Sequence, residues 1–435
     1  MNLDSLFKIK ARGTTPLKEL LAGITTWVTM VYIVAVNPHM LSDAGMDFGA
    51  VFVATCLAAA FGCLIMGAVA NLPIALAPGM GLNAFFTYSI VLGMGLSWEL
   101  ALGAVFWSGF LFLILSLTKV REQIIYAMPE SIKTGIAIGI GFFLAVIGLG
   151  NAGIIVQGQG TLVALGDVHS WSVIFCSVGF VVTVALYSKG KNWAVIFGIA
   201  CVAILGWIFD PAANFESQVM SLPPAMSPTF MKLEVFLPLD VAILTVILSL
   251  LFVDIFDTSG TLVAVAKKGG LEDSEGKIEN LGKAMIADSG ATIAGSIFGT
   301  STTTSYIESN AGIAAGGKTG LTAIVVALLF LLTLFFSPLA ASLPSYATSP
   351  ALIFVAILLI GTLSNFSDWD DFSESAPLII TALLMPLSFS IADGLAAGVI
   401  TYTFVKIFSG NIKAIHPVMG ALTVAFICRF VWLVG

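Results

Sequence analysis

The sequence has very few charged residues for its length. Asp, Glu, Lys and Arg make up 10% of its 435 residues, whereas soluble domains carry about 25%. Hydrophobic residues account for 58%, and the mean hydropathy is +1.03. A soluble core of this size could not bury so much apolar surface. The chain is therefore expected to place most of its surface in lipid.

Cysteine, histidine and positive charge are scarce too, which excludes several kinds of site. The five cysteines lie inside apolar runs and form no CxxC pair, which argues against disulfides and a zinc site. The three histidines are scattered, so no metal site is expected. The formal net charge of -7 argues against nucleic acid as a partner. Residues 1–19 are polar and lack the apolar segment of a signal peptide.

Long apolar runs are abundant. Fourteen of them approach the roughly 20 residues that a helix needs to cross a bilayer. They are 20–40, 48–70, 74–92, 98–118, 129–149, 171–188, 192–209, 240–266, 281–298, 302–317, 320–343, 347–364, 375–391 and 392–410. A fifteenth run, 416–434, is compatible with spanning the membrane, lying at its interface or capping the bundle. We therefore expect an all-α polytopic membrane protein with about 14 transmembrane spans.

The basic residues indicate the orientation of these spans. With the N-terminus inside, the basic loops are all cytoplasmic; they are 118–121, 188–192, 266–283, 316–320 and 406–413. The outer loops carry one basic residue, Lys232. Basic residues accumulate on the cytoplasmic side of membrane proteins. The sequence thus predicts a multi-pass protein of the cell inner (plasma) membrane with a cytoplasmic N-terminus.

Fourteen spans divide into seven plus seven on either side of the outer loop 210–239. Because seven is odd, a second copy of the unit must run in the opposite direction, which is a common design of secondary transporters. Such a 7+7 inverted repeat predicts broken spans at matching positions. Span 3 (residues 72–86) and span 10 (residues 295–312) both show an extended start, a small or polar break and then a helical run. This correspondence predicts the binding site.

Span 8 carries two acidic residues in an apolar helix. Asp254 and Asp257 are three residues apart, so they share one helix face. Acidic side chains inside a membrane are costly and usually face a polar interior or a partner. No Lys or Arg lies in the middle of any confidently assigned span to neutralise them. A functional role is therefore favoured over a structural ion pair.

Span 10 adds Glu308, which follows a run of hydroxyl residues at 301–305. These hydroxyls are expected to cap a helix that begins inside the membrane, whose free N–H groups would supply partial positive charge. The alternative is that the hydroxyls only satisfy backbone groups while Glu308 reaches an interface.

Span 3 offers an amide and aromatic rings. Asn83 can both donate to and accept from a heterocycle edge, although a lone buried Asn more often ties helices together. Phe85 and Phe86 could stack on an aromatic ligand. Asp288 is interpreted as a structural tie near Lys283. Glu374 and Asp393 lie near span ends, and both are interpreted as interfacial charges.

These residues suggest how transport could be coupled to protons. A carboxyl group in a low-dielectric cavity can hold a proton near neutral pH. The protonated group donates a hydrogen bond, whereas the ionised group only accepts. Proton binding would then decide which edge of a ligand is accepted, so proton symport needs no further cofactor. A sodium site would require several converging oxygens, which the sequence does not exclude.

Four motifs carry a resemblance to a known family. They are TTWVTMVYIVAVNP (25–38), NLPIALAPGMGLNAFF (71–86), FVDIFDTSGTLVAVA (252–266) and GTSTTTSYIESNAGIAAGGKTGLTA (299–323). The sequence resembles the AzgA-type branch of the nucleobase–ascorbate transporter superfamily over nearly its whole length. Members of that branch are adenine, guanine and hypoxanthine permeases. The resemblance implies a secondary active transporter that imports purine nucleobases by alternating access.

The resemblance also implies the uracil-permease-like fold with a core and a gate domain. The implied core domain comprises 20–118 and 240–343. The implied gate domain comprises 129–209 and 347–410. The outer loop 210–239 joins the two halves, and the C-terminal apolar segment 411–435 follows the last span. Dimerisation through the gate domain and proton symport are implied as well.

The motifs imply roles for individual residues. Asn83, Asp254 and Glu308 would contact the purine, with Phe85 and Thr304 as further substrate-binding candidates. Asp257 would support proton coupling or helix positioning, and Asp254 is a second candidate for proton coupling. The uracil-permease branch has a histidine four residues after the first span 8 carboxylate, where this sequence has Thr258. The role of that histidine therefore does not transfer.

Other functions remain open from the residues alone. Another solute on the same fold, such as uracil, xanthine or an anion, is the main alternative. Acidic residues without a central base make a poor anion site, and inverted broken spans favour alternating access over a channel. The chain is not expected to be an enzyme, because the motif HExxH and a nucleophile elbow are absent.

Overall fold

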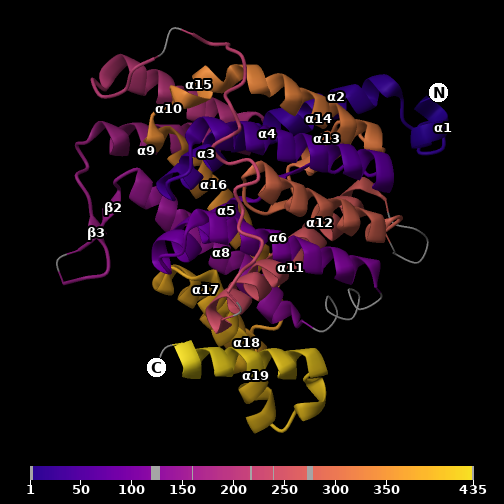
Figure 1. Ribbon diagram of the computed structural model, residues 1–435, viewed down its shortest axis with the longest axis vertical. Coiled ribbons are helices and arrows are strands. Elements are labelled where there is room, and N and C mark those ends of the chain that lie inside the picture. Colours follow the sequence, from indigo (N-terminus) through magenta and orange to yellow (C-terminus); the bar gives the residue numbers. More distant parts are fainter. Residues whose placement is uncertain are drawn as a thin grey trace.

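The computed structural model describes residues 3–118, 128–158, 160–215, 218–238, 240–271 and 278–433. In these ranges the chain is mostly helical, and its long helices pack side by side (Figure 1). The expected all-α fold needs one correction, because two short antiparallel strand pairs, β1–β4 and β2–β3, interrupt the helices. Parts of the expected loops at 118–121, 210–239 and 266–283 lie outside the described residues.

The elements fall in two halves along the chain. The first half contains α1 (Leu3–Phe7), α2 (Pro16–Met30), α3 (Ile33–Asp43), α4 (Phe48–Ile65), η1 (Met66–Ala70), β1 (Leu76–Pro78), α5 (Met80–Ala84), η2 (Phe85–Gly93), α6 (Trp98–Leu117), α8 (Glu130–Asn151), β2 (Ile155–Val156), β3 (Ala164–Leu165), α9 (Trp171–Ser188) and α10 (Ala194–Phe209). The second half contains α11 (Val241–Gly269), α12 (Leu281–Phe298), β4 (Thr303–Ser305), α13 (Ser309–Ala314), α14 (Gly320–Thr333), η3 (Leu334–Phe336), α15 (Ser337–Ala341), η4 (Ser345–Thr348), α16 (Ser349–Ile360), η5 (Gly361–Asn365), α17 (Phe372–Ser388), α18 (Ile391–Phe408), η6 (Ile412–Ala414) and α19 (Pro417–Leu433).

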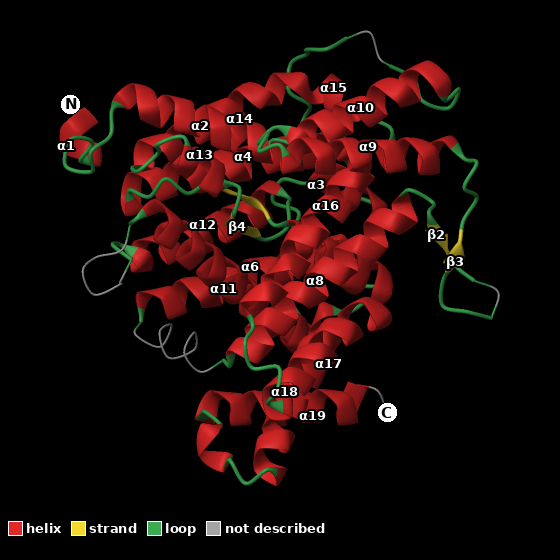
Figure 2. Ribbon diagram, turned by 180° about the vertical axis from the view of Figure 1, so that it is seen from behind, coloured by secondary structure: helices red, strands yellow, loops and turns green. Residues whose placement is uncertain are grey.

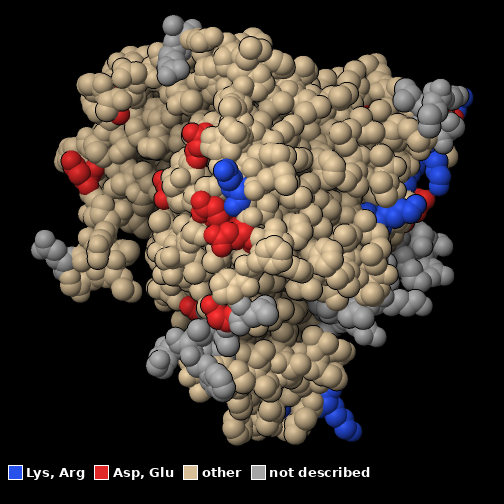
Figure 3. Space-filling model, in the orientation of Figure 1, with Lys and Arg blue, Asp and Glu red and all other residues tan. Residues whose placement is uncertain are grey.

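These helices make the chain a multi-pass membrane protein. Among the described residues, nine helical segments are long and apolar enough to cross a bilayer. Every apolar run expected to span coincides with helical elements, or with a strand followed by a helix, to within a few residues. Most of the surface shown in Figure 3 carries neither acidic nor basic side chains, as a lipid-facing surface requires.

The N-terminal helix and the hairpin β2–β3 lie at opposite ends of the bundle. In Figure 1, α1 is at one end of the long helices, and the hairpin β2–β3 is at the other. Because the basic loops predict a cytoplasmic α1, the same argument predicts that the hairpin lies outside.

The broken spans 3 and 10 meet through their strands in the interior (Figure 2). The register pairs Leu76 with Ser305 and Pro78 with Thr303. The hydrogen bond from Gly79 N to the carbonyl oxygen of Thr302 (3.0 Å) prolongs the ladder. An added Cβ on Gly79 would lie 2.5 Å from Thr304 Cγ2, so the strand passes span 10 too closely for a larger residue. Each strand thereby satisfies backbone groups that the other would leave unpaired in the membrane.

Charged side chains tie the ends of the helices together. Arg12, just after α1, donates to the carbonyl oxygens of Asn71 (2.7 Å) and Lys318 (2.8 Å) and pairs with Glu279 (3.0 Å). Burial alone would raise the pKa of Glu279, but hydrogen bonds from Lys8 and Arg12 and their charges bring it below its usual value. The N-terminal segment thus fastens the loops that precede β1, α12 and α14.

A second cluster holds α8, α17 and α18 together. Lys406 is 3% exposed, and its Nζ lies 2.7 Å from Glu374 Oε1 and 3.8 Å from Asp371 Oδ2. Glu374 also accepts a hydrogen bond from Ser131 Oγ at 2.5 Å. Glu374 is therefore a partner in a largely buried ion pair, a role that its position near a span end did not reveal.

We predict that Lys406→Met destabilises the protein by about 3–5 kcal/mol, because it leaves Glu374 buried without its cation. Thermal unfolding in detergent measures the change. Lys133→Met is the matched control: its partner Glu130 is exposed, and such a pair contributes at most about 1 kcal/mol. Equal effects of the two substitutions would contradict a special role for the buried pair.

Candidate functional site

The centre of the site is the polar face of α11. Asp254 and Asp257 lie on this face, as their spacing predicts; Asp254 is completely buried, while Asp257 is partly exposed. Asp254 Oδ2 is 3.3 Å from the hydroxyl of Thr292 on α12. That hydroxyl also donates to the carbonyl oxygen of Thr303 at 2.8 Å. Since a hydroxyl has one hydrogen, Asp254 receives at most a share of it.

Two threonines connect α11 to the strand of span 10. Thr304 Oγ1 lies 3.1 Å from Asp257 Oδ2 and 2.9 Å from Thr258 Oγ1. Thr258 stands at the position where the related branch has histidine, and here it contacts both Thr304 and Asp288. These contacts place the predicted site residues Asp257 and Thr304 next to each other.

Asp288 requires a correction. It was expected to be a structural tie near Lys283, but it is completely buried in α12 and faces α11. Thr258 Oγ1 lies 2.9 Å from Asp288 Oδ2. The motif IADSGAT gave no indication of this contact, because the facing of α12 toward α11 depends on the fold and not on local spacing. Asp288 is thus a third carboxyl group of the site.

Asn83 joins the site from α5. Its Oδ1 accepts a hydrogen bond from the hydroxyl of Ser301, and the side chain is completely buried. The hydroxyls at 301–305 do not cap a helix as expected: α13 begins at Ser309, and its N-cap residue Glu308 makes no capping hydrogen bond. The run extends instead into β4, where the hydroxyls of Thr304 and Ser305 bond to α11. Phe85, two residues after Asn83, begins η2 and is 1% exposed.

Glu308 has a partner that the sequence analysis missed. Tyr32 Oη donates to Glu308 Oε1 at 2.6 Å. Tyr32 lies at the break between α2 and α3 and is 2% exposed. The apolar run around it shows no break, so nothing in the sequence marked this tyrosine. An added Cβ on Gly312 of α13 would overlap Thr26 Oγ1 of α2, which shows how closely these two helices approach.

Several buried polar atoms of the site have no hydrogen-bond partner. They are Asn83 Nδ2, Asp254 Oδ1, Asp288 Oδ1, Thr302 Oγ1 and Thr303 Oγ1. Buried polar groups are normally satisfied by protein, water or ligand, so their gathering here marks a place that can receive a polar molecule. None of the ion pairs among the described residues involves Asp254, Asp257, Asp288 or Glu308.

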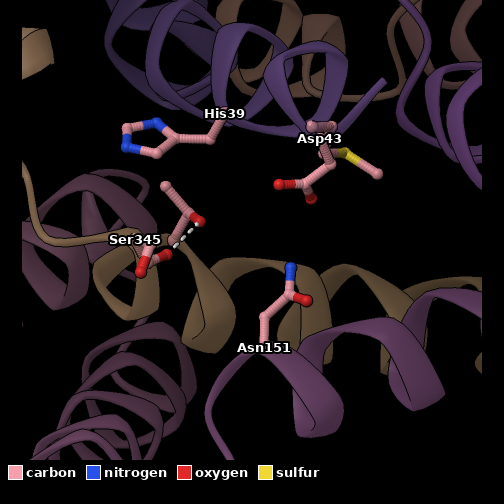
Figure 4. Close-up of a pocket in the computed structure, with 6 residues that line it drawn as sticks. His39, Asp43, Asn151 and Ser345 are labelled. Carbon is pink, nitrogen blue, oxygen red and sulfur yellow. Dashed lines mark hydrogen bonds between the residues drawn. The ribbon is translucent and has the colours of Figure 1, made fainter. Parts of the chain in front are cut away.

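A separate cavity of about 170 Å³ lies away from these residues (Figure 4). It is lined by His39, Met40, Asp43, Asn151, Ser345 and Thr348. In Figure 4, the amide of Asn151 at the end of α8 faces Asp43 at the end of α3 across the opening. Asp43 Oδ2 also accepts a hydrogen bond from Tyr88 Oη at 2.7 Å. None of the predicted site residues lines this cavity.

Comparison with known proteins identifies the family. A family model described as "Permease family" matches residues 17–428. The chain belongs to this permease family. The permease is 43% identical over 431 residues to the adenine permease AdeP of Escherichia coli K12, covering 99% of this chain and 96% of AdeP. It is 44% identical over 442 residues to the guanine/hypoxanthine permease PbuG of Bacillus subtilis 168, covering 99% and 100%. The resemblance drawn from the motifs is confirmed.

The fold of the permease is shared with a more distant protein. The transmembrane domain of the cyanobacterial bicarbonate transporter BicA superposes with a TM-score of 0.64, covering 86% of this chain and 96% of that domain. The two are 15% identical. At this distance the likeness concerns the fold alone.

We predict that Tyr32 and Glu308 are energetically coupled. Removing either partner of a hydrogen bond to a charged group should cost about 1.5–3 kcal/mol, and removing both should cost little more than removing one. Thermal unfolding of Tyr32→Phe, Glu308→Ala and the double variant in detergent measures the coupling. Tyr306→Phe is the matched control, since Tyr306 Oη donates to the carbonyl oxygen of Pro78. Additive effects of Tyr32→Phe and Glu308→Ala would contradict the contact.

Proposed function

We propose that this permease is a secondary active transporter that imports purine nucleobases: adenine, hypoxanthine, guanine or several of these. The observation that carries the proposal is the identity of 43–44%, over nearly the entire chain, to permeases named for adenine and for guanine/hypoxanthine. A transporter also fits a chain made of apolar helices better than an enzyme does.

The polar groups of the site suit a purine. A purine presents ring N–H donors next to ring nitrogens that accept, so it needs acceptors and donors held in one plane. Asp254 and Glu308 supply carboxyl oxygens, and the unpartnered Nδ2 of Asn83 is a buried donor. Phe85 lies on broken span 3, as Asn83 does, and Thr304 lies on broken span 10, as Glu308 does. We assign purine binding to these five residues.

The architecture we propose follows the inverted-repeat design. Fourteen spans form a 7+7 repeat with a core domain (20–118 and 240–343) and a gate domain (129–209 and 347–410). The proposed location is the inner (plasma) membrane with the N-terminus in the cytoplasm, and the proposed assembly is a homodimer through the gate domain. Transport is driven by proton symport, with the proton as the only coupling ion.

An anion substrate is less favourable despite the BicA-like fold. An anion near three carboxyl groups would be repelled unless a cation offset them. Lys406 and Arg12 are already engaged in ion pairs elsewhere. Neutral purines avoid this cost, because they need only hydrogen bonds.

The function is tested by uptake of radiolabelled adenine, guanine, hypoxanthine and uracil in cells that lack their own permeases. We expect uptake of at least one purine. Glu308→Ala should abolish it while the protein still inserts, because losing a charge-assisted hydrogen bond in a dry site costs about 1.5–3 kcal/mol or more. Lys133→Met serves as a matched surface control for expression and insertion. If cells that express the wild-type protein take up only uracil, or none of the four compounds, the proposal is refuted.

The two carboxyl groups of α11 should respond differently to neutralisation. Asp254→Asn should weaken purine binding, because an amide replaces a carboxyl group that meets the ligand. Asp257→Asn should leave binding measurable but uncouple transport from the proton gradient, because its side chain is permanently neutral. Calorimetry on purified protein measures binding, and uptake into liposomes with and without a pH gradient measures coupling. If Asp257→Asn still accumulates purine in response to the gradient, then the proton is carried elsewhere.

A further inference from the structure

Four side chains form a continuous hydrogen-bonded row between α12 and α11. In order, the row runs from Asp288 Oδ2 to Thr258 Oγ1 (2.9 Å), to Thr304 Oγ1 (2.9 Å) and to Asp257 Oδ2 (3.1 Å). Each of the three links joins two oxygens, so each link needs one hydrogen. The two threonine hydroxyls supply two. Three simultaneous hydrogen bonds therefore require a third hydrogen, which a protonated carboxyl group at one end of the row supplies.

The surroundings of Asp288 also favour a protonated carboxyl group. Asp288 is completely buried; the N–H of Ser305 is directed at its carboxyl group, but Oδ1 has no partner at full hydrogen-bond geometry. The ion pairs among the described residues offer it no cation. An ionised carboxylate in such a place carries a large desolvation cost, whereas a protonated one does not.

Neighbouring titratable groups also favour the presence of one proton on the row. Asp254 on α11 interacts electrostatically with both Asp257 and Asp288. Glu308 and Tyr306 on span 10 interact with Asp257. Like charges so close together disfavour the state in which all carboxyl groups are ionised. One added proton relieves this repulsion whichever end of the row it occupies.

We propose that Asp288 and Asp257 share one proton through Thr258 and Thr304, and that this row is the binding site of the coupling proton. This inference rests on the proposed function and deepens it, since it assigns the proton to four side chains and includes a carboxyl group outside the predicted set.

The proton moves along the row without net loss of atoms. With the proton on Asp288, its O–H donates to Thr258, Thr258 donates to Thr304, and Thr304 donates to the ionised Asp257. When each hydrogen crosses its own link, the O–H bond of Asp288 breaks and an O–H bond forms on Asp257. Both hydroxyls are restored, and the negative charge has moved to Asp288.

The two ends of the row differ in exposure. Asp288 is the buried end, and Asp257 is partly exposed. Proton exchange with water therefore takes place at Asp257, the partly exposed end of the row. Thr304 belongs to β4. A movement of the strand pair would therefore break or form the hydrogen bonds of Thr304 to Thr258 and Asp257.

The test breaks the row without removing a carboxyl group. Purified full-length protein in liposomes is assayed for purine accumulation under an imposed pH gradient and for purine counterflow without one. Thr258→Val should lower accumulation to the level seen without a gradient while counterflow remains measurable, and Thr258→Ser should restore the response. Ser259→Ala is the matched control, because the Ser259 hydroxyl bonds to the Phe256 carbonyl oxygen of its own helix. Accumulation by Thr258→Val at the wild-type level would overturn the proposal.

A second measurement needs no purine. Infrared spectra of substrate-free protein should contain a protonated-carboxyl band that is weakened in both Asp288→Asn and Asp257→Asn. A band lost in only one of them places the proton on a single residue and overturns the sharing. Wild-type liposomes that fail to take up purine would refute the proposed function, whereas the infrared result would still decide the shared proton.

Discussion

Satisfying backbone hydrogen bonds away from water is the constraint on which this site depends. A membrane helix can be broken only where its freed N–H and C=O groups find partners inside the protein. Here each broken span supplies the partner of the other, because β1 pairs with β4. The pairing brings Asn83, just after one strand, close to Ser301, just before the other. The backbone pairing of β1 with β4 therefore also brings the polar side chains next to the two strands together.

The strand pair also explains why the site is made of hydroxyl and carboxyl groups. Helices α11 and α12 flank β4, and their side chains face strand residues whose backbone groups are already used. Short hydroxyls fill this space and link the carboxyl groups without bringing in a competing cation. None of the ion pairs in the described part of the chain involves these acids, so no cation there holds them in the ionised form. A site built in this way suits a neutral ligand that carries its own donors and acceptors.

The sequence predicted most of the elements and part of the site. Apolar length located the helices to within a few residues, because lipid imposes the same length on every span. The spacing of Asp254 and Asp257 correctly predicted a shared face, since three residues along a helix determine it. Asp288 and Tyr32 were missed for different reasons. The facing of Asp288 depends on how α12 packs against α11, and the break at Tyr32 lies in an uninterrupted apolar run.

Charge placement also bears on how the proposed domains could move. The ion pairs that join distant described elements stay within one proposed domain: Lys406 links α17 and α18 of the gate, and Arg12 links loops of the core. Among the described residues, the polar contacts between the proposed domains are neutral hydrogen bonds, such as those from Ser89 Oγ to the carbonyl oxygen of Phe389 and from Trp207 Nε1 to that of Ser342. Single neutral hydrogen bonds contribute about 0.5–1.5 kcal/mol each, far less than a buried ion pair costs when broken. Among the described residues, the strong polar contacts therefore lie inside each proposed domain, and the proposed alternating-access movement would cost least at the boundary between the two.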